Sequence, residues 1–524
     1  MSWDEVVRAG VERAALTLAR RRPGPFHIGV LLENVPEYLF WLGGAALAGA
    51  TIVGINPTRR GPELARDVVH TDCQLVVTDQ NGLEVLEPLG LALGRDQILV
   101  VDDPSYQAEL ASCRDAPMPE ARPSPDSLLL LVFTSGSTGA PKAVRCSTGR
   151  LGAIGTRAAP RYGFRRDDVC YCSMPLFHGN ALMALWAPAL STGATVAIRR
   201  KFSASGFLPD VRRFGATFFN YVGKSLAYIL ATPELPDDAD NPLERGFGTE
   251  ASERDIETFQ RRFGCRIVEG YGMSEGGANI VRVPDTPKGA LGRPENDTTF
   301  ILDPGSGDEC PRACFDGHGR LLNGDRAIGE IVNKSGAAGF EGYYRNDEAD
   351  AERTRFGWYW TGDLGYRDEG GFFYFAGRGT DWLRVDSENF AAAPIERILF
   401  RLPEVVMAAV YAVPDPQAGD QVMVALELRP GAVFDPDGFA AFLGAQDDLG
   451  TKWAPRFVRI TGAMPLTGSN KLIKKPLQDA RWECADPVWW RPGRELSYRL
   501  LGEVDVAAIR KAFADHGRLD VLTS

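Results

Sequence analysis

From residue 27 onward, short apolar runs alternate along the chain with longer segments whose apolar positions recur at helical spacing. HIGVLLEN (27–34) is followed by VPEYLFWLGGAALAG (35–49), TIVGINP (51–57), GPELARDVVHT (61–71) and CQLVVTD (73–79). Short apolar runs predict strands, whereas a period near 3.6 predicts helices. Because strand and helix in alternation are typical of βαβ units, the sequence predicts an α/β fold with mostly parallel sheets covered on both faces.

The same alternation continues through the middle of the chain. SERDIETFQRRFG (252–264) predicts an amphipathic helix, for which Ser252 is a natural N-cap. The strand-like runs of this region are DVCYCSM (168–174), ATVAIRR (194–200), TFFNYV (217–222) and RIVEGYG (266–272). Ligands of such sheets bind at the carboxyl ends of the strands, so we expect the functional site there.

Two uncharged runs resemble membrane spans in composition, LFWLGGAALAGATIVGI (39–55) and ALMALWAPALSTGATVAI (181–198). Glycines interrupt both, Pro188 interrupts the second, and each ends in a β-branched stretch. Both are also at or below the length of about 20 residues that a spanning helix needs. We therefore expect a buried helix that leads into a buried strand in each case, and no membrane span.

The pattern changes near residues 376–381. WYWTGDLGYRDEGGFFYFAGR (358–378) is rich in Gly and predicts small antiparallel strands, whereas PIERILFRLPEVVMAAVYAVPD (394–415) and QVMVALELRPG (421–431) predict a compact α+β unit. The predicted divisions are a large N-terminal domain with a small barrel-like β subdomain (1–378), a smaller α+β C-terminal domain (379–485) and a C-terminal extension (486–524).

Composition narrows the class of protein further. Hydrophobic residues make up 44% of the 524 residues, charged residues 24%, and the formal net charge is −11. This acidic balance argues against nucleic-acid binding, which requires basic surface.

The opening MSWDEVVRAG lacks the apolar stretch of a signal peptide, and nine scattered cysteines are typical of reduced thiols, so we expect a cytoplasmic protein. Cys310, Cys314 and His318 form the one ligand-like cluster, which without a fourth ligand we interpret as a surface loop and not a zinc site.

TSGSTGAPK (134–142) directly follows the apolar run LLLLVF (128–133). Its glycines and hydroxyl residues suit a loop whose backbone N–H groups surround phosphate oxygens. It is not a Walker loop, because Gly139 is followed by Ala140 and Lys142 by Ala143. Alone, the loop predicts anion binding and leaves the anion open.

Four further motifs follow it in order: EGYGMSEGG (269–277), YWTGDLG (359–365), FAGRGTDWLRVDSENF (375–390) and TGSNKLIKKPL (467–477). Together with the loop, this set resembles the adenylate-forming superfamily of acyl-CoA synthetases, non-ribosomal adenylation domains and luciferases. The resemblance covers residues 2–485. FNYVGKSLAYIL (219–230) and the RVDSEN loop look most like bacterial fatty-acid–CoA ligases related to fatty-acid transport proteins.

The resemblance implies a two-step reaction and a mobile C-terminal domain that acts as a lid. ATP and a carboxylate give an acyl adenylate and pyrophosphate, and CoA then displaces AMP. Lys471 matches the lysine that enters the site during adenylation, and Glu275 matches the acidic residue that positions Mg²⁺. The residues that match the pyrophosphate loop are Thr134, Ser135, Gly136, Ser137, Thr138, Gly139 and Lys142.

The remaining site residues are implied in the same way. Tyr271 matches the aromatic that stacks on adenine, and Asp363, supported by Arg378, matches the carboxylate that accepts the ribose hydroxyls. The other residues expected around the nucleotide are Gly248, Thr249, Glu250, Ala251, Glu269, Gly270, Gly272, Met273 and Ser274. The expected acid pocket consists of Phe177, His178, Tyr221, Gly223, Met273, Ser274 and Gly277. His178 stands where amino-acid-activating relatives tend to carry aspartate, which favours an aryl or aliphatic acid.

Two positions depart from the family pattern. Thr380 occupies a hinge position that is often aspartate or lysine, and Ser387 replaces a glycine that lets pantetheine pass close to the backbone. Ser387 puts the CoA step, but not adenylation, in question.

The leading hypothesis is an acid–CoA ligase that uses ATP, Mg²⁺ and CoA. The alternative is a diazotase that activates nitrite and transfers it to an arylamine. A fatty-acid carrier and a nucleotide-binding pseudoenzyme are less favoured, and the oligomeric state is left open.

Overall fold

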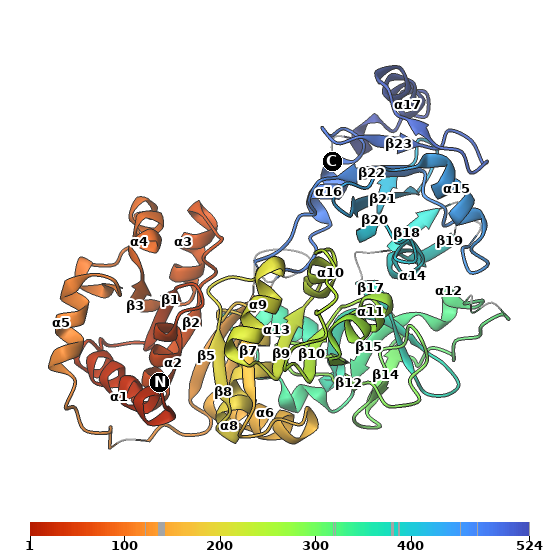
Figure 1. The fold of residues 1–524 in the computed structure, drawn as a ribbon. Helices are drawn as coiled ribbons and strands as arrows, with labels where there is room; N and C mark the ends of the chain where they lie inside the picture. Colours follow the sequence, from red (N-terminus) through yellow and green to blue (C-terminus); the bar gives the residue numbers. More distant parts are fainter. Residues whose placement is uncertain are drawn as a thin grey trace.

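The structure is a computed structural model. It describes residues 1–120, 122–134, 142–317, 319, 321–378, 382–385, 388–450, 452–468 and 470–522. Figure 1 shows two large sheets in the first half of the chain, a small antiparallel sheet after them, and a C-terminal sheet that stands above these three.

The first sheet has six strands in the order β4-β3-β1-β2-β5-β6, and all neighbours pair in parallel except β5 with β6. Its strands are β1 (His27–Leu31), β2 (Thr51–Gly54), β3 (Cys73–Thr78), β4 (Ile98–Val100), β5 (Leu128–Thr134) and β6 (Lys142–Ser147). The helices in this part of the chain are α1 (Trp3–Ala19), α2 (Pro36–Ala48), α3 (Gly61–His70), α4 (Gln80–Leu86) and α5 (Pro104–Ser112).

The second sheet has seven strands in the order β13-β12-β11-β10-β9-β7-β8, with a parallel centre and two short antiparallel strands at one edge. Its strands are β7 (Val169–Cys172), β8 (Thr195–Ile198), β9 (Phe218–Val222), β10 (Arg245–Thr249), β11 (Arg266–Tyr271), β12 (Ile280–Val281) and β13 (Arg293–Pro294). Its helices are α6 (Thr148–Arg161), α7 (Gly179–Ala181), the π-helical turn η3 (Leu182–Trp186), α8 (Ala187–Thr192), α9 (Ala204–Phe214), α10 (Ser225–Leu230) and α11 (Glu253–Phe263).

The two large sheets share one hydrophobic core, in which Ile28 of β1 and Trp41 of α2 belong to the same cluster as Cys170 of β7 and Leu185 of η3. This packing follows from the predicted pattern, because both uncharged runs became a buried helix that leads into a strand. Within the described part of the chain, no helix is both long and apolar enough to cross a membrane.

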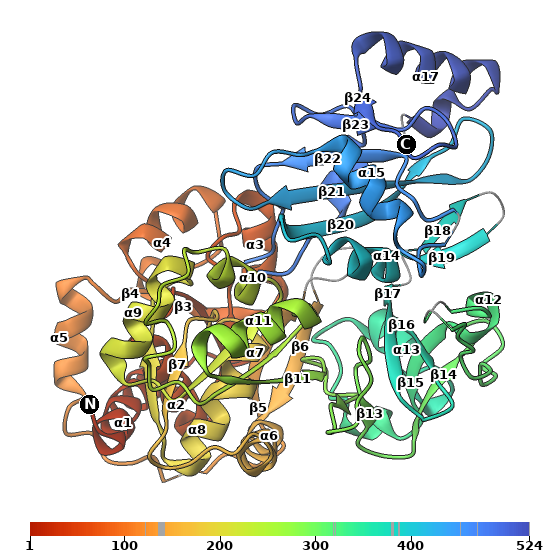
Figure 2. The same cartoon turned by 45° about the vertical axis from the view of Figure 1, so that its right-hand side comes forward.

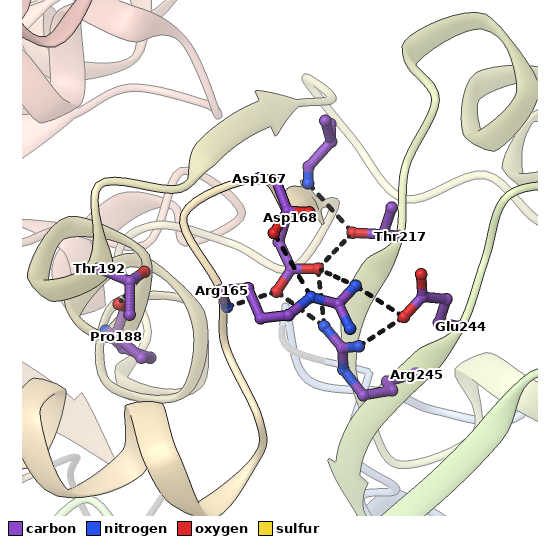
Figure 3. A network of polar contacts seen from close by, with 9 residues as sticks. Arg165, Asp167, Asp168, Pro188, Thr192, Thr217, Glu244 and Arg245 are labelled. Carbon is purple, nitrogen blue, oxygen red and sulfur yellow. Dashed lines mark hydrogen bonds and ion pairs between the residues drawn. The ribbon is translucent and has the colours of Figure 1, made fainter.

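Asp168, immediately before β7, organises the starts of three parallel strands (Figure 3). The Arg245 guanidinium donates to both oxygens of its carboxylate at 2.7 Å, and the Thr217 hydroxyl donates to Oδ1 at 2.8 Å. The Arg165 guanidinium adds a contact at 3.3 Å. Asp168 is fully buried, so these partners replace the water that its charge has lost.

A four-stranded antiparallel sheet follows, formed by β14 (Thr299–Leu302), β15 (Gly329–Asn333), β16 (Tyr359–Arg367) and β17 (Phe373–Arg378). It corresponds to the predicted β subdomain, and α12 (Gly324–Ala327) and α13 (Asp347–Arg353) lie in its connections.

The C-terminal sheet has five strands in the order β20-β21-β22-β23-β24. Its strands are β20 (Val405–Pro414), β21 (Asp420–Leu428), β22 (Phe457–Thr461), β23 (Val488–Trp490) and β24 (Arg499–Leu500), and the ribbon of β18 (Trp382–Val385) and β19 (Glu388–Ala391) precedes it. The helices are α14 (Ala392–Leu399), α15 (Pro436–Gly444), α16 (Lys475–Ala480) and α17 (Glu503–Asp515). β20 reads as one apolar run because both faces of this sheet are buried, one under α14 and α15 and the other under α16 and α17.

The α/β fold class is confirmed, with parallel sheets in the first half and a separate C-terminal unit (Figure 2). The predicted division at residues 378/379 remains a prediction, and residues 379–381 lie outside the described part of the chain. The predicted extension, 486–524, contributes β23 and β24 to the C-terminal sheet, so its strands complete that sheet.

Candidate active site

A cleft of about 3170 Å³ lies between the first three sheets and the C-terminal unit. It collects most of the predicted site residues from distant parts of the sequence. The predicted residues that line it are Thr134, Lys142, His178, Thr249, Glu250, Ala251, Glu269, Gly270, Tyr271, Gly272, Met273, Ser274, Glu275, Asp363, Arg378 and Lys471.

Lys471 reaches into this cleft from the C-terminal unit. Its ammonium donates to Glu250 Oε1 at 2.8 Å, and its backbone N–H donates to the Thr467 hydroxyl at 3.0 Å. Although desolvation opposes the shift, the Lys471 and Arg378 charges hold the pKa of Glu250 below its usual value. Glu250 adopts a left-handed backbone conformation with φ of 71°, which costs a residue with a side chain roughly 1–2 kcal/mol. Such conformations concentrate at functional sites.

Gly223 explains why the Lys471 loop can come so close. Its φ is 59°, and a Cβ there would lie 2.5 Å from the carbonyl oxygen of Asn470. Any side chain would therefore push away the residue that precedes Lys471. Gly223 thus contacts the C-terminal unit and not the lining of the cleft.

Tyr271 and Asp363 meet at the carboxyl end of β11. The Tyr271 hydroxyl donates to Asp363 Oδ2 at 2.7 Å, and Arg378 Nε lies 3.6 Å from Asp363 Oδ1. Burial raises the pKa of Asp363, and the Arg378 guanidinium opposes that shift. An aromatic ring beside a carboxylate with free acceptor capacity is the chemistry that a nucleoside requires, since the ring stacks on a base and the carboxylate accepts hydroxyl hydrogens.

Glu275 also lines the cleft and is buried. The Tyr343 hydroxyl donates to Glu275 Oε1 at 3.0 Å, and Arg353 Nε donates to the Tyr343 hydroxyl at 3.3 Å. Lys142 Nζ lies 5.4 Å from the centre of the Tyr343 ring and 3.3 Å from Glu352 Oε2. A carboxylate and an ammonium are thus held on two sides of one tyrosine.

Glu269 of β11 also lines the cleft. The Tyr221 hydroxyl and the Ala251 backbone N–H both donate to its Oε1, at 3.0 and 2.7 Å. Burial nevertheless raises the pKa of Glu269 to about 7. Gly248 packs against the Tyr221 ring, because a Cβ there would lie 2.5 Å from that ring.

The predicted acid pocket is placed in part. His178 lines the cleft, and burial, together with the nearby Lys471 charge, lowers its pKa to about 4. Of the other predicted pocket residues, Met273 and Ser274 line the cleft, whereas Phe177, Tyr221, Gly223 and Gly277 do not. Tyr221 is fully buried, and the carbonyl of Gly277 accepts a hydrogen bond from Asn333 Nδ2.

A set of apolar residues that the sequence did not predict lines the cleft, and we call this set the apolar strip. It consists of Ala153 and Ile154 of α6, Met183 and Ala184 of η3, and Phe247 of β10. A π-helical turn shifts the helical register by one residue and is frequent at functional sites. In the sequence, the uncharged run at 181–198, which contains η3, was the signal that could have indicated the apolar strip.

Several predicted residues lie outside the described part of the chain. They are Ser135, Gly136, Ser137, Thr138 and Gly139 of the phosphate loop, Thr380, Ser387 and His318. Thr134 and Lys142 flank that loop at the ends of β5 and β6, and the Thr134 hydroxyl donates to the Lys142 carbonyl at 3.5 Å. Lys224, Arg254 and Tyr343, which the sequence did not single out, also belong to the site or border it.

Among the described residues, no group of three or more His, Cys, Asp or Glu side chains is arranged to hold a metal. The single carboxylate of Glu275 is compatible with Mg²⁺, a hard cation that is often bound by one or two carboxylates together with phosphate oxygens and water. The site is therefore compatible with Mg²⁺ that arrives with a polyphosphate substrate.

Comparison with known proteins agrees with this geometry. The family model described as AMP-binding enzyme matches residues 2–344, and the AMP-binding enzyme C-terminal domain matches residues 394–471. The chain is 59% identical over 520 residues to the steroid-22-oyl-CoA synthetase of Rhodococcus jostii (strain RHA1), covering 99% of this chain and 94% of that protein. It is 48% identical over 489 residues to the medium/long-chain-fatty-acid–CoA ligase of Mycobacterium tuberculosis, covering 93% of each.

Solved structures share the fold. ATP-bound MatB from Rhodopseudomonas palustris has a TM-score of 0.78 at 23% identity, covering 92% of this chain and 93% of that one. The anthranilate CoA ligase AuaEII in complex with anthranoyl-AMP has a TM-score of 0.77 at 20% identity, covering 92% of both. The predicted resemblance is confirmed: the chain belongs to the AMP-binding enzyme family and is an ATP-using, adenylate-forming ligase.

Proposed function

We propose that the enzyme activates a bulky apolar carboxylic acid as its acyl adenylate and transfers the acyl group to CoA. The observation that carries this proposal is the position of Lys471, which reaches the cleft that Tyr271, Asp363 and Glu275 line. A cation from the C-terminal unit and a nucleoside-type site thus face the same space.

The described residues supply what the first step requires. When a carboxylate oxygen attacks the α-phosphate of ATP, negative charge develops on the phosphate oxygens and on the leaving pyrophosphate. Lys471 and Lys142 offer ammonium groups for that charge, Glu275 would hold Mg²⁺, and Tyr271 with Asp363 would hold the adenosine. Bound Mg²⁺ would neutralise part of the triphosphate charge.

The apolar strip supports a bulky substrate. Its members, Ala153, Ile154, Met183, Ala184 and Phe247, are uncharged and all line the cleft. The two curated relatives described above are named for a steroid-22-oyl group and for medium or long fatty acids. We therefore expect a substrate of steroid or medium- to long-chain fatty type, with its carboxylate near His178 and its apolar body along the strip.

The neutral state of His178 fits this assignment. With its pKa lowered to about 4, the imidazole carries no charge near pH 7. Its Nδ1 accepts from the Asn180 N–H at 3.3 Å, so the neutral ring carries its N–H donor at Nε2. Nothing in the comparisons supports nitrite as the activated anion.

All nine cysteines are free, which supports a reducing compartment such as the cytoplasm.

A substrate panel tests this proposal. The protein is incubated with ATP, Mg²⁺, CoA and one acid at a time: a steroid with a C22 carboxylate, fatty acids from short to long, aryl acids, and nitrite with an arylamine. We expect AMP, pyrophosphate and a thioester with the bulky apolar acids. Pyrophosphate release that follows nitrite and gives no thioester would overturn the proposal in favour of the diazotase.

Variants in the strip test the pocket itself. Ala184→Phe should lower kcat/KM for the bulky acids by about 10–100-fold and leave short acids nearly unchanged, because an overfilled pocket excludes large substrates. The matched control is Leu190→Phe, since Leu190 of α8 is 45% exposed and does not line the cleft. Equal effects of Ala184→Phe on short and long acids would place the acid elsewhere.

A further inference from the structure

Two segments about 150 residues apart in sequence meet at the first turn of α11. Arg254 Nη1 donates to the carbonyl of Leu402 at 2.7 Å, and Arg254 Nη2 donates to the carbonyl of Val405 at 2.9 Å. The Leu402 carbonyl belongs to the turn that joins α14 to β20 in the C-terminal unit, and Val405 is the first residue of β20. The buried Asp255 carboxylate lies 3.2 Å from Arg254 Nη2 and helps to fix the guanidinium.

The geometry of this contact is directional. Both bonds come from one guanidinium and end on two carbonyls that are three residues apart in the chain. The Val405 N–H also donates to the Leu402 carbonyl at 3.2 Å, so the turn is a rigid target. Because a guanidinium is planar and presents several N–H groups in a fixed arrangement, two such bonds fix the orientation of the turn as well as its distance.

The neighbouring contacts hold the same surfaces together but give less direction. Lys224 Nζ lies 4.1 Å from the centre of the Phe400 ring, and the Tyr228 hydroxyl lies 3.0 Å from Met407 Sδ. Ala227 of α10 belongs to the apolar cluster on one face of the C-terminal sheet. The burial of Ala227 favours no direction, because apolar burial is non-directional, whereas the two hydrogen bonds of Arg254 do.

The same stretch of chain meets the C-terminal unit a second time at Glu250, four residues before Arg254, where Lys471 donates at 2.8 Å. We propose that Arg254 is a positioning residue that docks the α14–β20 turn and thereby holds Lys471 in the cleft for adenylate formation. The proposal rests on the role of Lys471 given under the proposed function. Arg254 touches neither reacting group in this role; it acts through the orientation of the C-terminal unit.

The test uses the full chain with Arg254→Ala. Acid-dependent pyrophosphate release should fall about tenfold or more, as expected for the loss of hydrogen bonds from a charged group. Binding of AMP should stay within about twofold, because Tyr271 and Asp363 lie outside the C-terminal unit. A zero-length carbodiimide cross-link between Lys471 and Glu250, mapped by mass spectrometry, should fall in parallel with pyrophosphate release.

Two further variants serve as comparisons. Arg261→Ala is the control, because Arg261 belongs to the same helix but its side chain is 66% exposed and lies 3.6 Å from Glu234. It should change neither pyrophosphate release, nor AMP binding, nor the cross-link yield. Arg254→Lys keeps the charge but not the planar pair of donors, so its cross-link yield should lie between wild type and Arg254→Ala.

The outcomes separate the two proposals. An unchanged cross-link yield and unchanged pyrophosphate release in Arg254→Ala would overturn the docking role. Loss of AMP binding or of thermal stability in parallel would also overturn it, because Arg254 would then be structural. If the wild type releases no pyrophosphate with any acid, the proposed function fails, while the cross-link comparison still decides the docking role.

Discussion

Tyr343 connects the carboxylate proposed for Mg²⁺ with a lysine of the phosphate loop. Its hydroxyl donates to Glu275 Oε1 at 3.0 Å, and its ring lies 5.4 Å from Lys142 Nζ. Removal of a group that orients a metal ligand commonly lowers metal affinity by about 10–100-fold. Tyr343→Phe should therefore raise the Mg²⁺ concentration for half-maximal pyrophosphate release by at least about tenfold. Metal-free AMP binding is the control, and an unchanged Mg²⁺ requirement would show that Tyr343 does not orient Glu275.

Glu269 makes the stability of the fold depend on pH. Burial raises the pKa of its carboxyl from 4.5 to about 7, so the folded protein binds the proton more tightly than the unfolded chain. Its contribution is complete below about pH 4.5 and is lost as the pH rises toward 7. Glu269→Gln does not titrate, so its stability relative to wild type should grow across this window. The gain should be at most about 3 kcal/mol, from 1.36 kcal/mol for each unit of pKa. Urea unfolding at a series of pH values measures it, and a difference that shrinks with rising pH would contradict the assignment.

At the scale of elements, the Asp168 network fixes the starts of β7, β9 and β10 relative to one another. Arg245→Ala would leave a fully buried carboxylate without the Nη2 group that donates to both of its oxygens, and loss of one member of such a pair costs about 3–5 kcal/mol. We expect a loss of unfolding free energy of that size in urea titrations. Arg261→Ala, at an exposed site, should cost under about 0.5 kcal/mol. A similar small cost at Arg245 would mean that water or Arg165 compensates the Asp168 charge.

The sequence predicts elements well where their pattern is local. CQLVVTD became β3, and SERDIETFQRRFG became α11, with the Ser252 hydroxyl accepting from the Asp255 N–H at 3.1 Å as an N-cap should. The π-helical turn in the run at 181–198 could not be predicted, because it depends on neighbouring packing. A Cβ on Gly155 of α6 would lie 2.7 Å from the carbonyl of Ala187, the first residue of α8 after this turn. Helices α6 and α8 therefore approach closely at this point.

At the scale of the whole molecule, the candidate site depends on contacts that no local pattern encodes. The motifs identified Lys471, Asp363 and Glu275 individually, through resemblance to a family. Their assembly requires the C-terminal unit to dock on α10 and α11. Arg254 contributes through its contact with Leu402, about 150 positions away, and Gly223 through its contact with Asn470, about 250 positions away. Such pairings arise from the tertiary fold, so the sequence indicated the chemistry of the site without its geometry.

Adenylate formation requires that a carboxylate oxygen attack the α-phosphorus of ATP. In that step the bond from the α-phosphorus to pyrophosphate breaks, and in the second step the thiol of CoA displaces AMP from the acyl carbon. One carboxylate oxygen must therefore end in AMP. The most direct measurement uses a bulky apolar acid with both carboxylate oxygens labelled as ¹⁸O, followed by mass spectrometry of the products. We expect AMP that carries one ¹⁸O atom for each thioester formed. Label in inorganic phosphate together with ADP, or unlabelled AMP, would contradict it.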